Sequence, residues 1–232
     1  MKGAELYDDP VFLAGYRQLR RDKLGLNEEL EIPAMAALLP PVDGLQVVDL
    51  GCGEGGLAVR LAEAGASAVV AVDASESMLS RASQHSRVYY VRSDLADFDL
   101  APGTVDLVVS SLALHYVEDL EGLVARIRSW LSPGRRLVFS VEHPIITAPL
   151  EPSDGGVDDY ADEGPRQRSW FVDGVVKYHR TIGSTLATLQ RQGFALEAVE
   201  EPQPTEVQIR HYPHLAVHRR RPPLLLVSAR VR

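Results

Sequence analysis

Residues 45 to 58 constrain the fold more than any other stretch, because they join an apolar run to a cluster of glycines. The run from Leu45 to Leu50 lies between two glycines, a pattern typical of a buried strand that enters a glycine-rich turn at Gly51. The apolar positions that follow predict a short helix ending near Gly65. Since glycines let the backbone approach a ligand closely, a strand, turn and helix of this kind form half of a nucleotide-binding unit.

The spacing of Gly51, Gly53 and Gly56 fits the dinucleotide fingerprint, and by itself it does not separate NAD(P) from S-adenosyl-L-methionine (SAM). Asp49 separates them, because its carboxylate would repel a pyrophosphate at the turn and would attract the ammonium and sulfonium of SAM. The stretch from Val47 to Gly55 closely resembles the first motif of class I SAM-dependent methyltransferases. An ordinary α/β turn with a capping aspartate is the alternative.

Length and composition limit the classes of protein that need to be considered. A chain of 232 residues predicts a single domain, 1–232, with a sizeable core. Cys52 is the only cysteine, so an intrachain disulfide is impossible. No apolar run approaches a membrane span or a signal peptide, and we expect a cytoplasmic protein with no membrane partner. A net charge of -8 argues against a nucleic-acid substrate.

Two helices are expected in residues 1–42, ahead of the first strand. The first would run from Val11 to about Leu24, and the second, capped by Asn27, from Glu28 to Leu39. Helices in this place often form a lid over the cofactor, and Tyr16 would then face the cofactor. Simple packing of Tyr16 without any lid is an equal alternative.

The rest of the chain continues the alternation of strands and helices. The resemblance implies an α/β, Rossmann-like class I methyltransferase fold with a seven-stranded, mostly parallel sheet, an antiparallel last strand and helices on both faces. Further strands are expected at 67–72, 88–91, 104–110, 136–141, 194–200 and, antiparallel, 224–231, with helices at 120–131 and 181–192. We expect residues 145–180 to form an insertion that caps the substrate pocket, with a hairpin turning at Asp173-Gly174.

Acidic residues follow the strands where a ligand at the carboxyl edge of the sheet would meet them. Asp73 comes 24 residues after Asp49, and its two oxygens would match the two hydroxyls of a ribose; helix capping is the alternative. The resemblance implies that Asp94 accepts a hydrogen bond from the adenine amino group, although Asp97 and Asp99 crowd the same loop. The cofactor-binding candidates are Tyr16, Asp49, Gly51, Cys52, Gly53, Asp73, Ala74, Met78, Asp94, Leu95 and Ser110.

The segment after the fourth strand, Ser110 to Val117, is similar to the family's fourth motif, which lies beside the transferred methyl group. Enzymes that methylate nucleobase amino groups carry an Asn- or Asp-Pro-Pro-aromatic signature here. This chain has Ser110-Ser-Leu-Ala113 instead, so that activity is not expected. The resemblance extends over nearly the whole chain and is to a bacterial branch that acts on small molecules.

Methyl transfer requires an acceptor held in line with the methyl group, and a base where the acceptor carries a proton. His115 is the first candidate for that base, because its motif follows the strand nearest the methyl group and imidazole titrates near neutrality. The catalytic candidates are His115, Glu142, His143 and Tyr178.

Each catalytic candidate also has a structural alternative. His115 could bond a loop, Glu142 could pair with Arg180, and His143 could fix the exit of the fifth strand. Tyr178, with Tyr160 and Trp170, could form the core of the insertion instead of an aromatic wall for a flat substrate.

His211, His214 and His218 do not follow a zinc-binding spacing, and we expect a surface loop and no metal. The leading hypothesis is a SAM-dependent methyltransferase that acts on nitrogen, oxygen or an electron-rich carbon of a small organic, perhaps aromatic, molecule. The alternatives are methylation of RNA or protein, a SAM-binding sensor or partner without turnover, and a dehydrogenase. No repeat or coiled-coil pattern indicates an oligomeric state.

Overall fold

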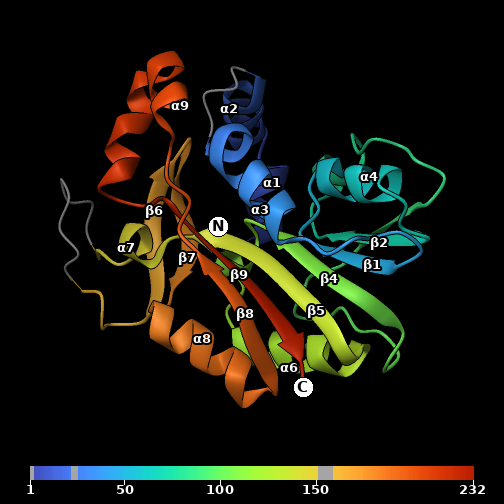
Figure 1. Cartoon of the computed structure of the whole chain (residues 1–232). Coiled ribbons are helices and arrows are strands. Elements are labelled where there is room, and N and C mark those ends of the chain that lie inside the picture. Colours follow the sequence, from blue (N-terminus) through green and yellow to red (C-terminus); the bar gives the residue numbers. More distant parts are fainter. Residues whose placement is uncertain (1–2, 22–25, 151–158) are drawn as a thin grey trace.

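The computed structural model describes residues 3–21, 26–150 and 159–232. A seven-stranded sheet forms its centre, with the strand order β3-β2-β1-β4-β5-β9-β8 (Figure 1). The first five strands are parallel, and β9 runs antiparallel between β5 and β8. The predicted mostly parallel sheet with an antiparallel last strand is therefore confirmed. The strands are β1 Gln46–Leu50, β2 Ala68–Asp73, β3 Val88–Arg92, β4 Val105–Ser111, β5 Leu131–Glu142, β8 Phe194–Glu200 and β9 Leu224–Val231.

Helices cover both faces of this sheet. On one face α3 and α4 pack over β1, β2 and β4, and on the other α6 and α8 pack over β4, β5 and β9 (Figure 1). The bounds are α3 Ile32–Leu38, α4 Gly56–Glu63, α5 Glu76–Leu79, α6 Leu120–Trp130 and α8 Ile182–Arg191. None of the described helices is both long and apolar enough to cross a bilayer.

The segment ahead of β1 contains more helices than the sequence predicts. A short helix α1 (Gly3–Asp8) precedes α2 (Pro10–Arg21), and Asp9 Oδ1 caps α2 by accepting from the amide of Phe12 at 2.9 Å. Residues 22–25 lie outside the described part of the chain, so the predicted end of this helix near Leu24 is not described.

The second predicted helix of this segment begins differently from expectation. Asn27 does not cap it, and that prediction is wrong. A π-helical turn, η1 (Asn27–Glu31), starts at Asn27 and leads directly into α3. The preceding Leu26 is already helical, so its backbone and not a side chain continues the turn.

The insertion after β5 contains helix α7 (Pro144–Thr147) and a two-stranded sheet of β6 (Gly164–Trp170) and β7 (Val172–His179). The hairpin reverses at Phe171, which has a φ of 60°, so the predicted turn at Asp173-Gly174 is wrong. Gly174, with a φ of 76°, lies at a register shift within β7. Its left-handed conformation suits a β-bulge as well as a turn, which explains the error.

Two helical segments replace the surface loop that was expected around His211, His214 and His218. They are α9 (Glu206–His211) and the 3-10 helix η3 (Pro213–Arg219), and a capping box of Thr205 and Gln208 starts α9. Figure 1 shows α9 beside the N-terminal helices. The Gln208 side-chain amide donates to the carbonyl of Glu29, which fastens α9 to η1.

Trp130 is the largest fully buried side chain, and it ends α6 under the sheet. Its indole packs against Phe98, with ring centroids 5.5 Å apart, and its Nε1 donates to Asp99 Oδ1 at 2.7 Å. This contact joins the loop after β3 to the main core.

Replacement of Trp130 by alanine should therefore lower the free energy of unfolding by about 3–5 kcal/mol, as for other large-to-small core changes. Urea denaturation followed by far-ultraviolet circular dichroism measures the loss. The control is Val11→Ala, at a side chain that is 63% exposed, with an expected change within about 0.5 kcal/mol. Equal effects of the two changes would contradict the prediction.

Candidate active site

One cavity of about 1430 Å³ lies over the carboxyl ends of the central strands. Residues of α1, α2 and η1, the loops after β1 to β5, the hairpin β6–β7 and η3 all line it. Because parallel strands end at the same edge, side chains distant in sequence meet there. The cavity therefore collects residues from nearly every part of the chain.

Gly51 allows the loops after β1 and β4 to approach each other closely at the base of this cavity. It has a φ of 76°, and its amide donates to the carbonyl of Val72 at 2.8 Å. A Cβ at this position would lie 2.2 Å from the Cβ of Ala113, which belongs to the loop after β4. Only glycine satisfies both the backbone conformation and this close approach.

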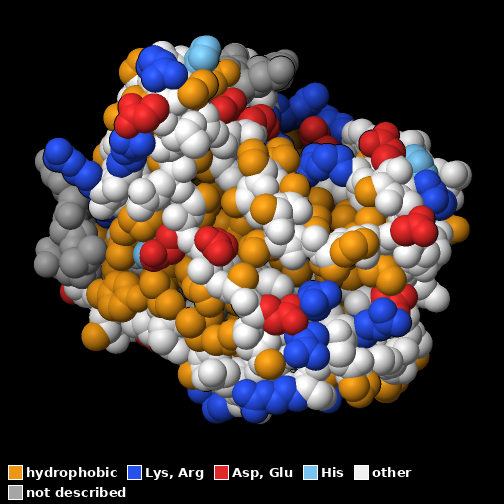
Figure 2. Space-filling view, viewed as in Figure 1, with side chains coloured by type: hydrophobic (Ala, Val, Ile, Leu, Met, Phe, Trp, Pro, Cys, Tyr) orange, Lys and Arg blue, Asp and Glu red, His pale blue; other side chains and the backbone are white. Residues whose placement is uncertain are grey.

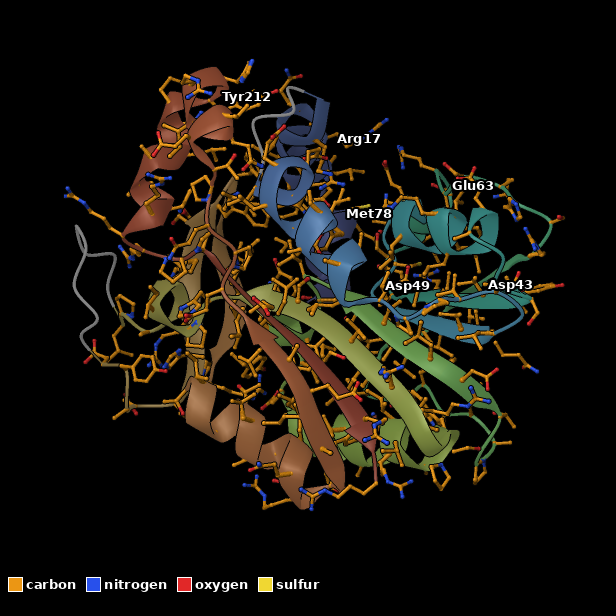
Figure 3. All side chains as sticks on the ribbon, in the orientation of Figure 1. Arg17, Asp43, Asp49, Glu63, Met78 and Tyr212 are labelled. Carbon is orange, nitrogen blue, oxygen red and sulfur yellow. The ribbon has the colours of Figure 1, made fainter. Side chains whose placement is uncertain are left out.

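Asp49 ends up almost fully buried at the tip of β1, with 1% of its surface exposed (Figure 3). Neither carboxylate oxygen has a hydrogen-bond partner among the described residues. Burial, with the nearby charges of Asp73 and Glu31, raises the pKa of Asp49 to about 7 against the opposing effect of Arg60. An unpartnered buried carboxylate that lines a cavity fits a cationic ligand group such as the ammonium of SAM.

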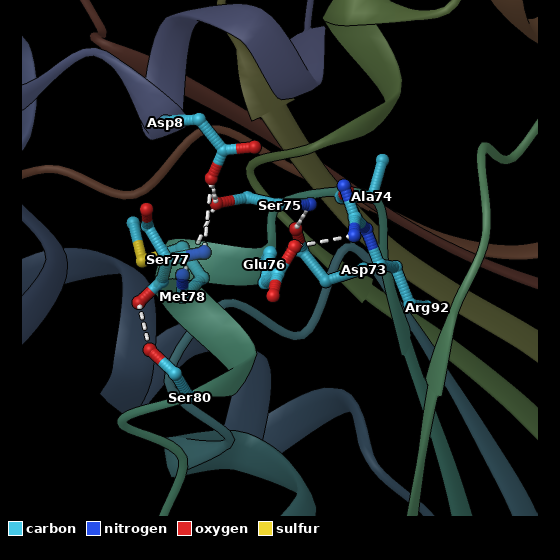
Figure 4. A network of polar contacts seen from close by, with 9 residues as sticks. All are labelled: Asp8, Asp73, Ala74, Ser75, Glu76, Ser77, Met78, Ser80 and Arg92. Atoms are coloured by element: carbon cyan, nitrogen blue, oxygen red, sulfur yellow. Dashed lines mark hydrogen bonds and ion pairs between the residues drawn. The ribbon is translucent and has the colours of Figure 1, made fainter.

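Asp73, at the end of β2, is part of a polar network around α5 (Figure 4). Its Oδ2 accepts from the amide of Gly53 at 2.8 Å and its Oδ1 from the amide of Ser75 at 2.9 Å. Ser75 caps α5 and donates its hydroxyl to Asp8 Oδ1 at 2.6 Å. Burial raises the pKa of Asp73 despite these amides. The network fixes Asp73 at the cavity wall and ties α1 to the same loop.

All of the predicted cofactor-binding residues except Ser110 line the cavity. Ser110 is fully buried within the sheet, where its hydroxyl donates to the carbonyl of Leu50 at 2.7 Å. Of the three crowded acids after β3, Asp94 lines the cavity, whereas Asp99 binds Trp130 and Asp97 lies outside. Asp94 was chosen from the sequence because it lies just beyond the strand, and this criterion selected the one aspartate of the three that lines the cavity.

His115 lies in the 3-10 turn η2 (Leu114–Tyr116) and lines the cavity with only 5% of its surface exposed. Its Nδ1 has no hydrogen-bond partner among the described residues. Burial lowers the pKa of His115 to about 4, against the opposing charge of Glu142. The imidazole is therefore neutral near pH 7, with a ring nitrogen available to a ligand.

Glu142, at the end of β5, pairs with Lys177 of β7. The suggested pairing of Glu142 with Arg180 is wrong, because Arg180 donates to the carbonyls of Val117 and Glu118. Burial would raise the pKa of Glu142, but Lys177, His115 and Arg168 together outweigh it and hold this pKa below its usual value. Glu142 is consequently a charged group in the cavity wall.

His143 does not line the cavity. Its Nδ1 accepts from the amide of Ile145 at 3.1 Å, which caps α7, and its Nε2 lies 2.6 Å from Glu201 Oε1. Tyr178 does line the cavity, and its hydroxyl donates to Glu118 at 2.7 Å. Of the four catalytic candidates, the fold brings His115, Glu142 and Tyr178 together at one cavity.

Aromatic side chains form a wall of the cavity and a small core at the same time. Tyr7, Tyr16 and Trp170 line the cavity and pack around Phe12, Tyr7 and Trp170 edge-to-face and Tyr16 stacked. The Lys177 ammonium lies 4.8 Å from the ring centroid of Trp170. Tyr160 is outside this group, and its hydroxyl accepts from an amide at the start of α8. Both alternatives for the insertion's aromatic residues thus describe part of the arrangement.

Sequence reasoning missed several residues of the site. Lys177 is one of three lysines, and a lone lysine in an apolar strand was a usable signal. No local signal indicated Glu31 and Tyr7, which reach the cavity from the segment ahead of β1. Tyr116 lies in the motif after β4 but was not singled out, and His214 and His218 line the cavity although a surface loop was expected there. No cluster of possible metal ligands occurs among residues 3–21, 26–150 and 159–232.

Comparison with known proteins agrees with this geometry. The methyltransferase domain family matches residues 47–134. A SAM-dependent methyltransferase of Mesorhizobium loti has a structure that is 48% identical in sequence and superimposes with a TM-score of 0.84, covering 89% of this chain and all of that one. The chain belongs to the class I SAM-dependent methyltransferases. An uncharacterized protein of Haemophilus influenzae is 34% identical over 97% of this chain and 96% of its own length.

A further relative of this methyltransferase matches over a shorter part of the chain. A malonyl-[acyl-carrier protein] O-methyltransferase of Pectobacterium atrosepticum is 34% identical over 46% of this chain and 42% of its own length. This chain therefore spans less than half of that relative.

Asp49→Asn should separate cofactor binding from stability. A folded-state pKa of about 7, against about 3.9 when unfolded, means that ionisation of Asp49 opposes folding progressively as the pH rises from 4 to 7. The ligand-free variant should gain thermal stability relative to the wild type at pH 8 but not at pH 4. Its affinity for S-adenosylhomocysteine should fall at least tenfold, since the ligand's ammonium loses its partner.

Thermal unfolding at the two pH values and calorimetric titration measure these effects. Asp43→Asn, at an exposed carboxylate (Figure 3), is the matched control and should change neither quantity. A stability difference that is the same at pH 4 and pH 8 would show that Asp49 does not carry the buried charge.

Proposed function

We propose that this methyltransferase transfers the methyl group of SAM to nitrogen, oxygen or an electron-rich carbon of a small organic molecule. The proposal is carried by the single cavity that both the cofactor-binding residues and His115, Glu142 and Tyr178 line. Its volume of about 1430 Å³ exceeds the range of roughly 300–1,000 Å³ typical of one ligand. Donor and acceptor can therefore occupy it together.

The surroundings of the cavity support a small acceptor. Helices α1, α2 and η3 and the hairpin β6–β7 contribute to its walls, which include the aromatic side chains of Tyr116 and Trp170. Figure 2 shows basic and acidic side chains interspersed on the face in view, without a broad basic patch. A net charge of -8 likewise disfavours a polyanionic substrate.

SAM supplies an electrophilic methyl group on a sulfonium. Asp49 would bind its ammonium, Asp73 the ribose hydroxyls and Asp94 the adenine amino group, with Met78 against the adenine face. Tyr16 would close over the cofactor from α2, which is the role expected of a lid formed by residues 1–42. These residues orient the methyl group towards the loop after β4, where His115 lies.

His115 would accept a proton from the acceptor at a ring nitrogen of its neutral imidazole. The carboxylate of Glu142 favours the imidazolium that this creates, because it raises the pKa of His115 against the effect of burial. Tyr178 would contact the acceptor from β7, within an aromatic wall that excludes water. Holding acceptor and methyl group in line is the larger contribution, at roughly 7–11 kcal/mol.

Calorimetric titration of the purified protein with S-adenosylhomocysteine and, separately, with NAD tests the cofactor assignment. Binding of the first alone is the expected result, because a pyrophosphate would meet Asp49 and Asp73. Binding of NAD without binding of S-adenosylhomocysteine would refute the proposal and favour a dehydrogenase.

Replacement of His115 by glutamine should lower kcat by about 10²- to 10⁴-fold for an acceptor that must lose a proton. Affinity for S-adenosylhomocysteine should stay the same. Because the pKa of His115 is about 4, the wild-type rate should show no inflection near pH 6.5 from this residue. The measurement is release of S-adenosylhomocysteine with an acceptor found by screening amines, phenols and indoles. His211→Gln, at an exposed histidine of α9, is the control; an unchanged kcat in H115Q would remove His115 from the mechanism.

A further inference from the structure

Glu31 is a buried carboxylate in the cavity wall that the mechanism above does not use. It ends the π-helical turn η1 and is 2% exposed. Its Oε1 accepts hydrogen bonds from the hydroxyls of Ser111 and Ser140, both at 2.8 Å. The Ser140 hydroxyl in turn accepts from the amide of Leu112 at 3.0 Å. The turn η1, which precedes β1 in the sequence, is thus held against the carboxyl ends of β4 and β5.

The register of the sheet shows where Glu31 lies relative to the other carboxylates. Ser111 and Ser140 are direct partners across β4 and β5. On β1, Asp49 pairs with a β4 residue two positions before Ser111, and therefore faces the same side of the sheet. Glu142 follows Ser140 by two positions and shares its face as well. Asp49, Glu31 and Glu142 consequently form an acidic row along the carboxyl edge, with Glu31 in the middle.

The three members of the acidic row differ in what balances their charge. The ammonium of the cofactor would neutralise Asp49, and Lys177 neutralises Glu142. Glu31 forms no ion pair with Lys or Arg within the described ranges, and its Oε2 receives no hydrogen bond there. Of the cavity-lining arginines, Arg17 and Arg20 pair with other carboxylates, Arg126 donates to the carbonyl of Leu95, and Arg60 acts on Asp49. A buried carboxylate without a cation is unfavourable by several kcal/mol, which a bound cation would offset.

Two backbone features accompany this arrangement. A π-helical turn such as η1 adds a residue to a helix turn and is frequent at functional sites. Leu112, which lines the cavity and donates to Ser140, has a φ of 53°, a conformation that a leucine adopts only when its surroundings impose it. Fastening η1 to the sheet would need only hydrogen-bond acceptors, and a glutamine would serve. The charge of Glu31 is therefore the feature that needs a ligand.

We propose that the methyl acceptor carries an ammonium group and that Glu31 binds this group through Oε2. The neutral imidazole of His115, whose Nδ1 is buried and without a partner, provides a second polar contact in the same cavity. The inference rests on the proposed function and narrows its substrate class to small amines. Glu31 would determine substrate specificity by binding the ammonium group. Which atom of the acceptor is methylated is a separate question.

Glu31→Gln tests the proposal, because a glutamine oxygen still accepts from both serines while the charge is lost. The probes are matched pairs of amine and alcohol, ethylamine with ethanol, 2-phenylethylamine with 2-phenylethanol and tryptamine with tryptophol, titrated into the protein loaded with S-adenosylhomocysteine. In the wild type at least one amine should bind tenfold or more tightly than its alcohol, as a charge-assisted contact predicts. In E31Q this preference should fall to within twofold, with the affinity for S-adenosylhomocysteine unchanged and a Tm no lower than that of the wild type, since a buried charge is removed.

Glu63→Gln is the matched control, since this exposed glutamate lies on α4 (Figure 3) outside the cavity and its loss should leave the preference intact. Absence of amine preference in every pair, or a preference that survives in E31Q, overturns the inference. A fall in affinity for S-adenosylhomocysteine in E31Q overturns it too, and assigns Glu31 to the cofactor's ammonium. Failure of the wild type to bind S-adenosylhomocysteine is a different result, because it refutes the proposed function itself.

Discussion

The close approach of two loops, one after β1 and one after β4, is the constraint on which the site depends. Gly51 lies so near Ala113 that a Cβ would overlap it, and the positive φ of Gly51 turns the chain away immediately after Asp49. Asp49 is thereby left in the cavity wall at the tip of a buried strand, and the loop that carries His115 starts beside it. Asp49 and His115 line one cavity because these two backbones touch.

This arrangement buries several charged side chains, and the chain compensates their charges in different ways. Lys177 pairs with Glu142, two backbone amides donate to Asp73, and two serine hydroxyls donate to Glu31. Asp49 has no such partner, so burial raises its pKa towards neutrality. The ligand-free protein therefore carries an electrostatic penalty at Asp49, which a cationic ligand in the cavity would relieve.

The parts of the site that could be predicted from the sequence are those with local signals. A glycine turn after an apolar run, and single acids just beyond strands, located Asp49, Asp73 and Asp94, since parallel strands end at one edge. Contacts between distant segments left no such signal: Glu31 bonds a residue 109 positions away, and Lys177 one that is 35 away. The hairpin turn was misplaced because a glycine with positive φ serves bulges as well as turns. The fold class can be predicted from local sequence patterns, whereas the pairing of charged residues can be known only from the tertiary structure.

The same long-range contacts fix the segment ahead of β1, whose role as a lid stays a prediction. Two carboxylates fasten the parts that contain α1 and η1: Asp8 holds Ser75 beside Asp73, and Glu31 holds Ser111 and Ser140 at the carboxyl ends of β4 and β5. Each hydrogen bond to a charged group contributes roughly 1.5–3 kcal/mol at most, and less at the exposed Asp8. The segment also buries Leu6 and Phe12 against Val175, and Leu30 in the core beside β1, so these apolar contacts hold it as well. Glu31 both lines the cavity and fastens this segment to the sheet, so a ligand bound at Glu31 would act directly on the position of η1.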